Sequence, residues 1–257
     1  MRRLLMTVLA ATAAVLAVAA PANAATPARW QPAVGLSWQM QFSGKLDTSV
    51  NAQVYDIDGA DSTKAQVAAL HQAGRKVVCY VDAGSFENWR ADAAKYPAAV
   101  RGKALDGWAG ERWLDVRNWA ALGPILAARF ADCKAKGFDA VDPDNMDGYS
   151  NDTGFPLTAA DQLTFNRRVA DLAHGLGLAV GLKNDLDQVT ALQPAFDFAV
   201  NESCRQYNEC GQLSPFVAVG KAVFHVEYKA AQCPTPASLR FGNIRKNLSL
   251  DAFRTAC

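Results

Sequence analysis

Strand-length apolar segments recur along this chain, and segments with helical punctuation lie between several of them. The helical segments are Ser62–Ala73, Trp119–Lys136 and Thr158–His174, and each begins with a capping residue or ends before a glycine. Repeated strand–helix alternation is typical of a parallel sheet covered by helices. The eight strand-like segments are Leu36–Phe42, Gln53–Ile57, Lys76–Val81, Phe138–Val141, Leu178–Leu182, Phe196–Val200, Ala222–Val226 and, more weakly, a segment near Asn243–Lys246.

Eight strands in about 230 residues match a (β/α)8 TIM barrel in number and size. We therefore predict a single α/β domain of this architecture over residues 34–257. A doubly wound sheet is the alternative. It is less favoured because the glycine-rich stretch at residues 174–184, "HGLGLAVGLKN", lacks G-x-G-x-x-G spacing and its glycines precede the strand.

The N-terminus has the pattern of a secretory signal peptide. Arg2 and Arg3 precede the apolar run Leu4–Ala20, and a small-residue cleavage site lies at Ala22–Ala24. We predict a signal peptide over residues 1–24 and a short exposed leader over residues 25–33. A membrane anchor is the alternative, but no basic stop-transfer cluster follows the apolar run.

The charge of the mature chain argues against a nucleic-acid-binding protein. Without residues 1–24, 24 basic residues face 25 acidic ones, which gives a net charge of −1. A nucleic-acid binder would show a basic face or stripe. No later segment is apolar for long enough to span a bilayer. We therefore expect a secreted, extracellular protein with no membrane association after cleavage, and we expect a monomer.

The mature chain has six cysteines, which in an oxidising compartment favour up to three disulfides. Six cysteines allow 15 pairings. Local spacing favours Cys204 with Cys210 and Cys233 with Cys257. The remaining two, Cys79 and Cys133, either bridge a strand to the following helix or stay buried thiols. No CxxC or His–Cys cluster is present, so we expect no metal site and no cofactor.

Polar residues follow six successive predicted strands. In a barrel, active-site residues lie where strands end and loops begin. Solvated loop starts would account for part of this pattern, but its recurrence favours a convergent site. The residues are Asp56, Asp58, Asp82, Asp142, Asp144, Lys183, Asn184, Glu202 and Glu227.

The densest group of carboxylates lies in residues 137–149, "GFDAVDPDNMDGY". Alternate residues of a strand share a face, so Asp142 and Asp144 aim at the barrel mouth together with Ala140. Asp139 is expected on the helix side or at the strand start, and Asp147 at the loop turn.

Two other kinds of site have less support. A calcium loop needs an oxygen ligand where Met146 lies, and no glutamate follows at the required spacing. A Ser-His-Asp hydrolase needs a histidine base near a serine, but the three histidines are scattered along the chain.

Carboxylate chemistry therefore remains, and glycoside hydrolysis needs two carboxyl groups that flank the scissile bond. We predict Asp144 and Glu202 as this pair. Aromatic residues near the strand ends indicate sugar-stacking platforms, although any one of them is more often a packing residue. They are Trp38, Tyr80, Trp89, Trp108, Trp113, Tyr149 and Tyr228.

Six segments resemble the secreted endo-α-1,4-polygalactosaminidases of glycoside hydrolase family 114. They are "VVCYVDAGSFENWR", "GERWLDVR", "GFDAVDPDNMDGY", "GLAVGLKND", "NESCRQYNEC" and "GKAVFHVEY", in that order over nearly the whole mature chain. The resemblance implies a (β/α)8 barrel that hydrolyses α-1,4-linked galactosamine chains internally. It also implies two essential acids, Asp144 in D-P-D-N and Glu202 in N-E-x-C. Ser203 replaces an expected glutamine and leaves the acid in place.

Similarity to barrel α-galactosidases implies that Asp144 attacks and Glu202 protonates. The polymer is cationic where it is deacetylated, so the additional carboxylates are expected to pair with its amines. A non-catalytic polysaccharide-binding barrel and an accessory protein of matrix synthesis are the alternatives, and stereochemistry stays open. The predicted substrate-binding residues are Trp38, Asp56, Tyr80, Asp82, Asp142, Asn145, Tyr149, Lys183, Asn184, Glu227 and Tyr228.

Overall fold

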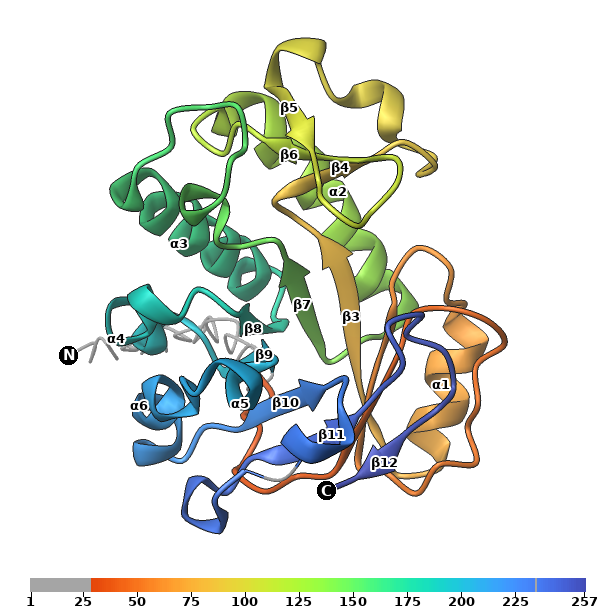
Figure 1. The fold of residues 1–257 in the computed structure, drawn as a ribbon. Coiled ribbons are helices and arrows are strands. Elements are labelled where there is room, and N and C mark those ends of the chain that lie inside the picture. Colours follow the sequence, from red (N-terminus) through yellow and green to blue (C-terminus); the bar gives the residue numbers. More distant parts are fainter. Residues whose placement is uncertain (1–28, 234) are drawn as a thin grey trace, which may run out of the picture.

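A curled sheet of nine strands forms the centre of the molecule in the computed structural model, which describes residues 29–233 and 235–257. The strand order is β1-β2-β3-β7-β8-β9-β10-β11-β12, and the first eight run parallel to their neighbours (Figure 1). The predicted signal peptide lies outside the described residues. The strands are β1 (Trp38–Gln41), β2 (Val54–Asp58), β3 (Lys76–Asp82), β7 (Ala140–Asp144), β8 (Ala179–Lys183), β9 (Phe198–Glu202), β10 (Val223–Glu227), β11 (Gly242–Arg245) and β12 (Thr255–Ala256).

All eight predicted strands are confirmed, but the sheet does not close through a backbone ladder. Among the described residues, β1 pairs with β2, whereas β11 pairs with β10 and the antiparallel β12. The two edges meet through a side chain, because Trp38 Nε1 donates to the Gly242 carbonyl oxygen at 2.8 Å. A Cβ at Gly242 would lie 2.5 Å from the Leu36 oxygen, so this approach requires glycine. The single α/β domain is thus confirmed, whereas the closed (β/α)8 barrel is not, because the eight parallel strands form an open, curled sheet.

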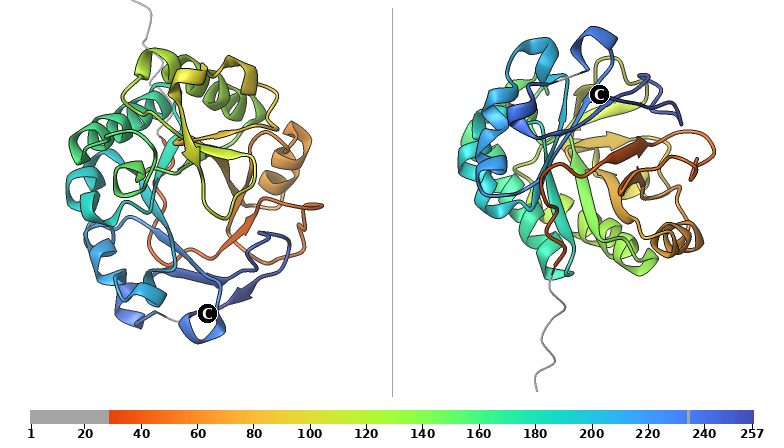
Figure 2. Two further views of the ribbon diagram at one scale, coloured as in Figure 1. Left: turned by 45° about the horizontal axis from the view of Figure 1, so that its top comes forward. Right: turned by 90° about the horizontal axis from the view of Figure 1, so that it is seen from below.

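The three predicted helices are present as α1 (Lys64–Gln72), α2 (Trp119–Lys136) and α3 (Ala159–Gly175). Thr63 and Thr158 cap α1 and α3 in capping boxes, and α2 ends at Gly137, whose φ is 96°. Figure 2 shows the helices around the outside of the curled sheet. After β8 the helical layer consists of shorter pieces, α4 (Val189–Leu192), α5 (Cys204–Tyr207) and α6 (Ser214–Ala218).

Short 3₁₀ turns complete the connections. They are Ala93–Lys95, Ala98–Val100, Gly148–Ser150, Leu186–Gln188, Gln193–Ala195, Cys210–Leu213, Ala230–Gln232 and Ala237–Leu239.

A small antiparallel sheet is inserted between β3 and α2. Its strands are β4 (Ser85–Glu87), β5 (Arg101–Ala104) and β6 (Glu111–Leu114), in the order β4-β6-β5. The sheet lies beyond the carboxyl ends of β3 and β7 (Figure 1). The sequence pattern does not predict this sheet, because its strands are short and lack a regular apolar alternation.

The core has two parts, one on each face of the curled sheet. Ala140 packs with Phe198 and Phe224 on the inner face, whereas Val141 packs with the helices on the outer face. This alternation confirms that even-numbered residues of β7 point inward. Asp139 lies at the strand start, where it accepts hydrogen bonds from Val77 N and Lys76 Nζ.

Residues 29–33 of the predicted leader pack against the base of the sheet. Arg29 forms an ion pair with Asp197 at 3.3 Å, and Gln31 donates to the same carboxylate at 2.9 Å. The backbone N–H of Ala222 donates to the Pro32 oxygen. The described part of this segment is therefore tied to the domain.

All six cysteines form disulfides, Cys79–Cys133, Cys204–Cys210 and Cys233–Cys257. The two locally predicted pairs are confirmed, and the third pair joins β3 to α2. Disulfides form and persist in oxidising compartments. Within the described residues, no helix has the length and apolar character that a membrane crossing requires.

Candidate active site

The carboxyl ends of β7, β8 and β9 bring Asp144, Lys183 and Glu202 to one cavity of about 350 Å³. Each of the three is the last residue of its strand. On each strand, the last residue lies four positions after an inward-facing residue and therefore points to the same inner face. These inward-facing residues are Ala140, Ala179 and Phe198. The convergence therefore follows from strand order and strand parity together.

Lys183 joins the two candidate catalytic carboxylates. Its Nζ lies 2.9 Å from Asp144 Oδ1 and 3.7 Å from Glu202 Oε2. These oxygens cannot be farther apart than the two distances combined, about 6.6 Å, a separation suited to two carboxyls that act on one glycosidic bond. The Lys183 side chain is only 2% exposed, and the carboxylates keep its ammonium charged. Burial opposes this charge, but Asp144, Glu202 and Asp142 raise the pKa of Lys183 well above its usual value.

Asp144 is held as an ionised group at the cavity floor. Tyr80 OH donates to its Oδ2 at 2.9 Å, and the backbone N–H of Asn145 donates to its Oδ1 at 2.7 Å. Burial would raise the pKa of the Asp144 carboxyl, but Lys183 and these hydrogen bonds hold the pKa below its usual value. A partly exposed carboxylate of this kind is suited to act as a nucleophile.

Glu202 faces Asp144 across Lys183 and has its own support. Tyr228 OH donates to Glu202 Oε1, and Asn184 Oδ1 accepts the backbone N–H of Glu202 at 3.0 Å. Burial, together with the neighbouring Glu202, raises the pKa of Tyr228, which therefore remains a protonated donor. The side chain of Glu202 is partly exposed.

Three predicted substrate-binding carboxyls do not line this cavity. Asp142 and Asp56 adjoin, are fully buried and have no other hydrogen-bond partner among the described residues. Burial raises the pKa of both, so this pair holds a proton near neutral pH. Asp82 accepts from Ser85 N at 2.8 Å and from Asn145 Nδ2 at 3.1 Å. It therefore orients the residue that follows Asp144.

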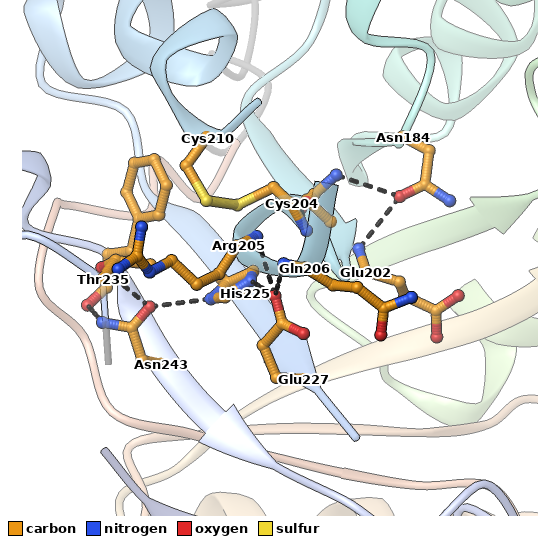
Figure 3. The surroundings of a disulfide bond; sticks show 12 residues. Asn184, Glu202, Cys204, Arg205, Gln206, Cys210, His225, Glu227, Thr235 and Asn243 are labelled. Carbon is orange, nitrogen blue, oxygen red and sulfur yellow. Dashed lines mark hydrogen bonds and ion pairs between the residues drawn. A yellow bond between two sulfur atoms is a disulfide. The ribbon is translucent and has the colours of Figure 1, made fainter. Parts of the chain in front are cut away.

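Two other predicted residues lie away from the cavity. Trp38 is 1% exposed, belongs to the inner core and packs on Phe224. Glu227, the last residue of β10, shares the outer face of this strand with Val223, whereas Phe224 and Val226 face the inner core. Its Oε1 accepts from Arg205 N at 2.8 Å, Gln206 N at 3.2 Å and a ring nitrogen of His225 at 3.0 Å. Figure 3 shows this arrangement at the start of α5, beside the Cys204–Cys210 disulfide.

The inserted sheet supplies one wall of the cavity, which the sequence analysis did not foresee. Trp89 is 53% exposed and Trp108 is 48% exposed, and both line the cavity. Arg90, also in this wall, is neutralised by Asp58 and Glu87 at 2.7 and 2.6 Å. Both tryptophans belong to the aromatic set that the sequence indicates for sugar stacking, but only the folded insertion places them opposite the strand ends.

A second cavity of about 260 Å³ adjoins the first, and Asp147, Asn184 and Glu202 line both. Tyr149 lines this second cavity. The predicted residues that line the first cavity are Tyr80, Asp144, Asn145, Lys183, Asn184 and Glu202.

Among the described residues, one group has possible ligand atoms close enough to one another to hold a metal ion. It consists of Cys204, Cys210 and His225. The two sulfur atoms are bonded to each other, so they are not available as thiolate ligands.

We predict that Lys183→Met raises the pKa of Asp144 by about 1 to 3, because the carboxylate loses the one direct cationic partner that it has among the described residues while burial persists. Carbon-13 NMR titration of aspartate-labelled protein measures this pKa, with D144N identifying the resonance. Lys64→Met, at an exposed helix position, is the matched control. An unchanged Asp144 titration in K183M would contradict the role of the ammonium.

Two solved structures resemble this chain over most of its length. Ega3 of Aspergillus fumigatus, in complex with galactosamine, has 41% sequence identity and a TM-score of 0.86, covering 90% of this chain and 99% of Ega3. The glycoside hydrolase domain of PelA from Pseudomonas aeruginosa has 15% identity and a TM-score of 0.68, covering 86% and 98% of the two chains. The second likeness concerns the fold alone.

Comparison with curated proteins found no matching sequence. The sequence model of glycoside-hydrolase family GH114 matches residues 19–257, which is nearly the whole chain. This match, together with the 41% identity to Ega3, shows that the chain belongs to glycoside-hydrolase family GH114.

Proposed function

We propose that this protein is a secreted endo-acting hydrolase that cleaves α-1,4-linked galactosamine in partly deacetylated polysaccharide. The observation that carries the proposal is the sharing of one buried ammonium by Asp144 and Glu202 at the meeting point of two open cavities. An internal bond of a long chain needs a site that is open on both sides. The likeness to the galactosamine complex of Ega3 supports the sugar.

In the proposed reaction, Asp144 attacks the anomeric carbon while Glu202 donates a proton to the departing glycosidic oxygen. The bond between the sugars breaks, and a covalent glycosyl ester forms on Asp144. Glu202, now ionised, then removes a proton from water, which hydrolyses the ester and returns both carboxyls to their starting state. Tyr228 holds Glu202 in position for both proton transfers.

The short separation of the carboxyls favours this retaining course. Inverting enzymes hold their carboxyls about 6.5 to 9.5 Å apart, because a water molecule must fit beside the sugar. The Lys183 bridge limits the distance between Asp144 Oδ1 and Glu202 Oε2 to at most about 6.6 Å, so this distance lies close to or below the lower end of that range. Asp144 therefore acts directly on the sugar.

The charge of the walls suits a cationic polymer. Asp61 and Glu111 line the first cavity, and Asp147 lies between the two cavities. Lys183 and Arg90 are both engaged by carboxylates. Charge complementarity of this kind speeds capture and sets specificity.

We also propose secretion as a monomer. Three disulfides and the predicted signal peptide support export to an oxidising environment. The (β/α)8 barrel is proposed as the parent architecture, with the contact between Trp38 and Gly242 in place of the last backbone ladder.

Asp144→Asn and Glu202→Gln are each expected to lower the rate of hydrolysis by at least about 1,000-fold, because each removes a group that bonds or protonates at the reacting centre. Binding of the polymer, measured by titration calorimetry, is expected to persist. Asp171→Asn, at an exposed position of α3, is the control. Binding by the wild type without any oligosaccharide product would instead indicate a non-catalytic polysaccharide-binding protein.

Proton NMR of a fresh digest is expected to show the α-anomer at the new reducing ends, because two displacements at one carbon restore its configuration. The β-anomer appears later by mutarotation. If the β-anomer appears first, Asp144 is not the nucleophile.

A fully N-acetylated polymer is expected to be hydrolysed at least about tenfold more slowly than its deacetylated counterpart, because acetylation removes the ammonium groups that pair with carboxylates. Product release is measured by mass spectrometry on one polymer preparation before and after chemical deacetylation. Equal turnover of both forms would contradict the electrostatic account of specificity.

A further inference from the structure

The second cavity is a strongly acidic hollow. The residues that line it include five carboxylates and no lysine or arginine within the described part of the chain, and an exposed tyrosine lies at its rim. They are Asp147, Asp185, Asp187, Glu202, Glu209 and Tyr207. Like charges this close repel one another, so a cationic ligand would relieve the repulsion.

Asp185 gives this hollow a polar group that lacks a partner. Its side chain belongs to a residue only 3% exposed, and its Oδ2 accepts from Asn166 Nδ2 at 2.8 Å. Its Oδ1 has no hydrogen-bond partner among the described residues, although Tyr149 lies beside it. Burial, and then the charge of Asp147, raise the pKa of Asp185 to about 7. A buried carboxyl oxygen without a donor is costly, and an ammonium group would supply one.

Tyr207 adds the surface that a sugar ring needs. It ends α5, is 65% exposed and lines the same hollow as Glu209 and Asp187. Aromatic faces bind the apolar face of a sugar, and they also attract ammonium groups. An aromatic ring beside several carboxylates therefore fits an amino sugar better than a bare metal ion, because the ring contacts a sugar but does not coordinate a metal ion.

The position of the second cavity determines which sugar of the polymer it contacts. Asp144 lines only the first cavity, whereas Glu202 lines both. In the proposed reaction, the sugar attacked by Asp144 lies in the first cavity, and Glu202 protonates the oxygen of the departing sugar. The departing sugar therefore lies on the side of the second cavity.

We propose that this second cavity binds the free amine of the 2-amino sugar on the leaving-group side of the scissile bond. Asp185, Asp187 and Glu209 receive the ammonium group, and Tyr207 contacts the sugar ring. The inference rests on the proposed function, because the role of Glu202 defines the leaving-group side. It implies that each cleavage creates a new non-reducing end that carries a free amine.

The test uses a partly acetylated galactosamine polymer, digested in ¹⁸O-labelled water with EDTA present. The oxygen label marks each new reducing end, so tandem mass spectrometry can report the acetylation of both terminal residues. With the wild-type protein, the ratio of free to acetylated amines at new non-reducing ends is expected to be at least about fivefold above the same ratio in the polymer, the preference that one partly screened ion pair provides.

The double variant Asp187→Asn/Glu209→Gln should lose most of this enrichment while its selectivity at the new reducing end stays unchanged. The side chains of Asp187 and Glu209 make no hydrogen bond or ion pair with the described residues, so the fold should persist, and circular dichroism checks this. Asp171→Asn is the matched control, because Asp171 lies at an exposed position of α3.

The outcomes separate the two proposals. Products whose non-reducing ends carry acetyl groups in proportion to the polymer would overturn this inference and leave the proposed function in place. A double variant that keeps the full enrichment would also overturn it. Absence of any product with the wild-type protein would overturn the proposed function, and the inference with it.

Discussion

The arrangement of the site depends on one buried ammonium group. Lys183 is almost fully excluded from water, and a buried charge is tolerated only when opposite charges and hydrogen bonds compensate it. Asp144 and Glu202 provide this compensation from β7 and β9, the strands on either side of β8, with Asp142 below Asp144 on β7. The same contacts that make Lys183 tolerable hold the two carboxylates at a fixed, short separation. The contacts that stabilise the buried Lys183 are therefore the same contacts that position the two carboxylates for the reaction.

Each carboxylate also has a support behind it. Asp82 holds the side chain of Asn145, whose backbone N–H donates to Asp144. On the other side, Glu227 accepts the first backbone N–H groups of α5, and the Cys204–Cys210 disulfide closes the loop that follows Glu202 (Figure 3). These outer contacts limit the movement of both strand ends, as a reaction that depends on a fixed separation requires.

The two cavities differ in ways that suit an extended, charged polymer. The first has an aromatic wall from the inserted sheet, and the second is lined by acids with one exposed tyrosine. Glu202 lies at the boundary of the two cavities. A polymer that passes Glu202 therefore contacts the first cavity on one side and the second cavity on the other. Selectivity on the two sides can then differ, because aromatic contact tolerates an acetyl group whereas ammonium–carboxylate pairing requires a free amine.

The eight strands and three long helices were readable from the sequence, because apolar runs and helical caps are local signals. Strand-end position also predicted that Asp144, Lys183 and Glu202 lie at one edge of the sheet, and parity predicted the inward direction of Asp144. Tertiary packing alone decided that Glu227 faces α5 while Tyr228 donates to Glu202, and that Trp38 lies in the core. It also decided that the inserted segment places Trp89 and Trp108 at the cavity. The edges of the main sheet meet through a side chain without a ladder of backbone hydrogen bonds. These outcomes depend on which face of a strand meets which neighbour, and a local pattern does not contain that information.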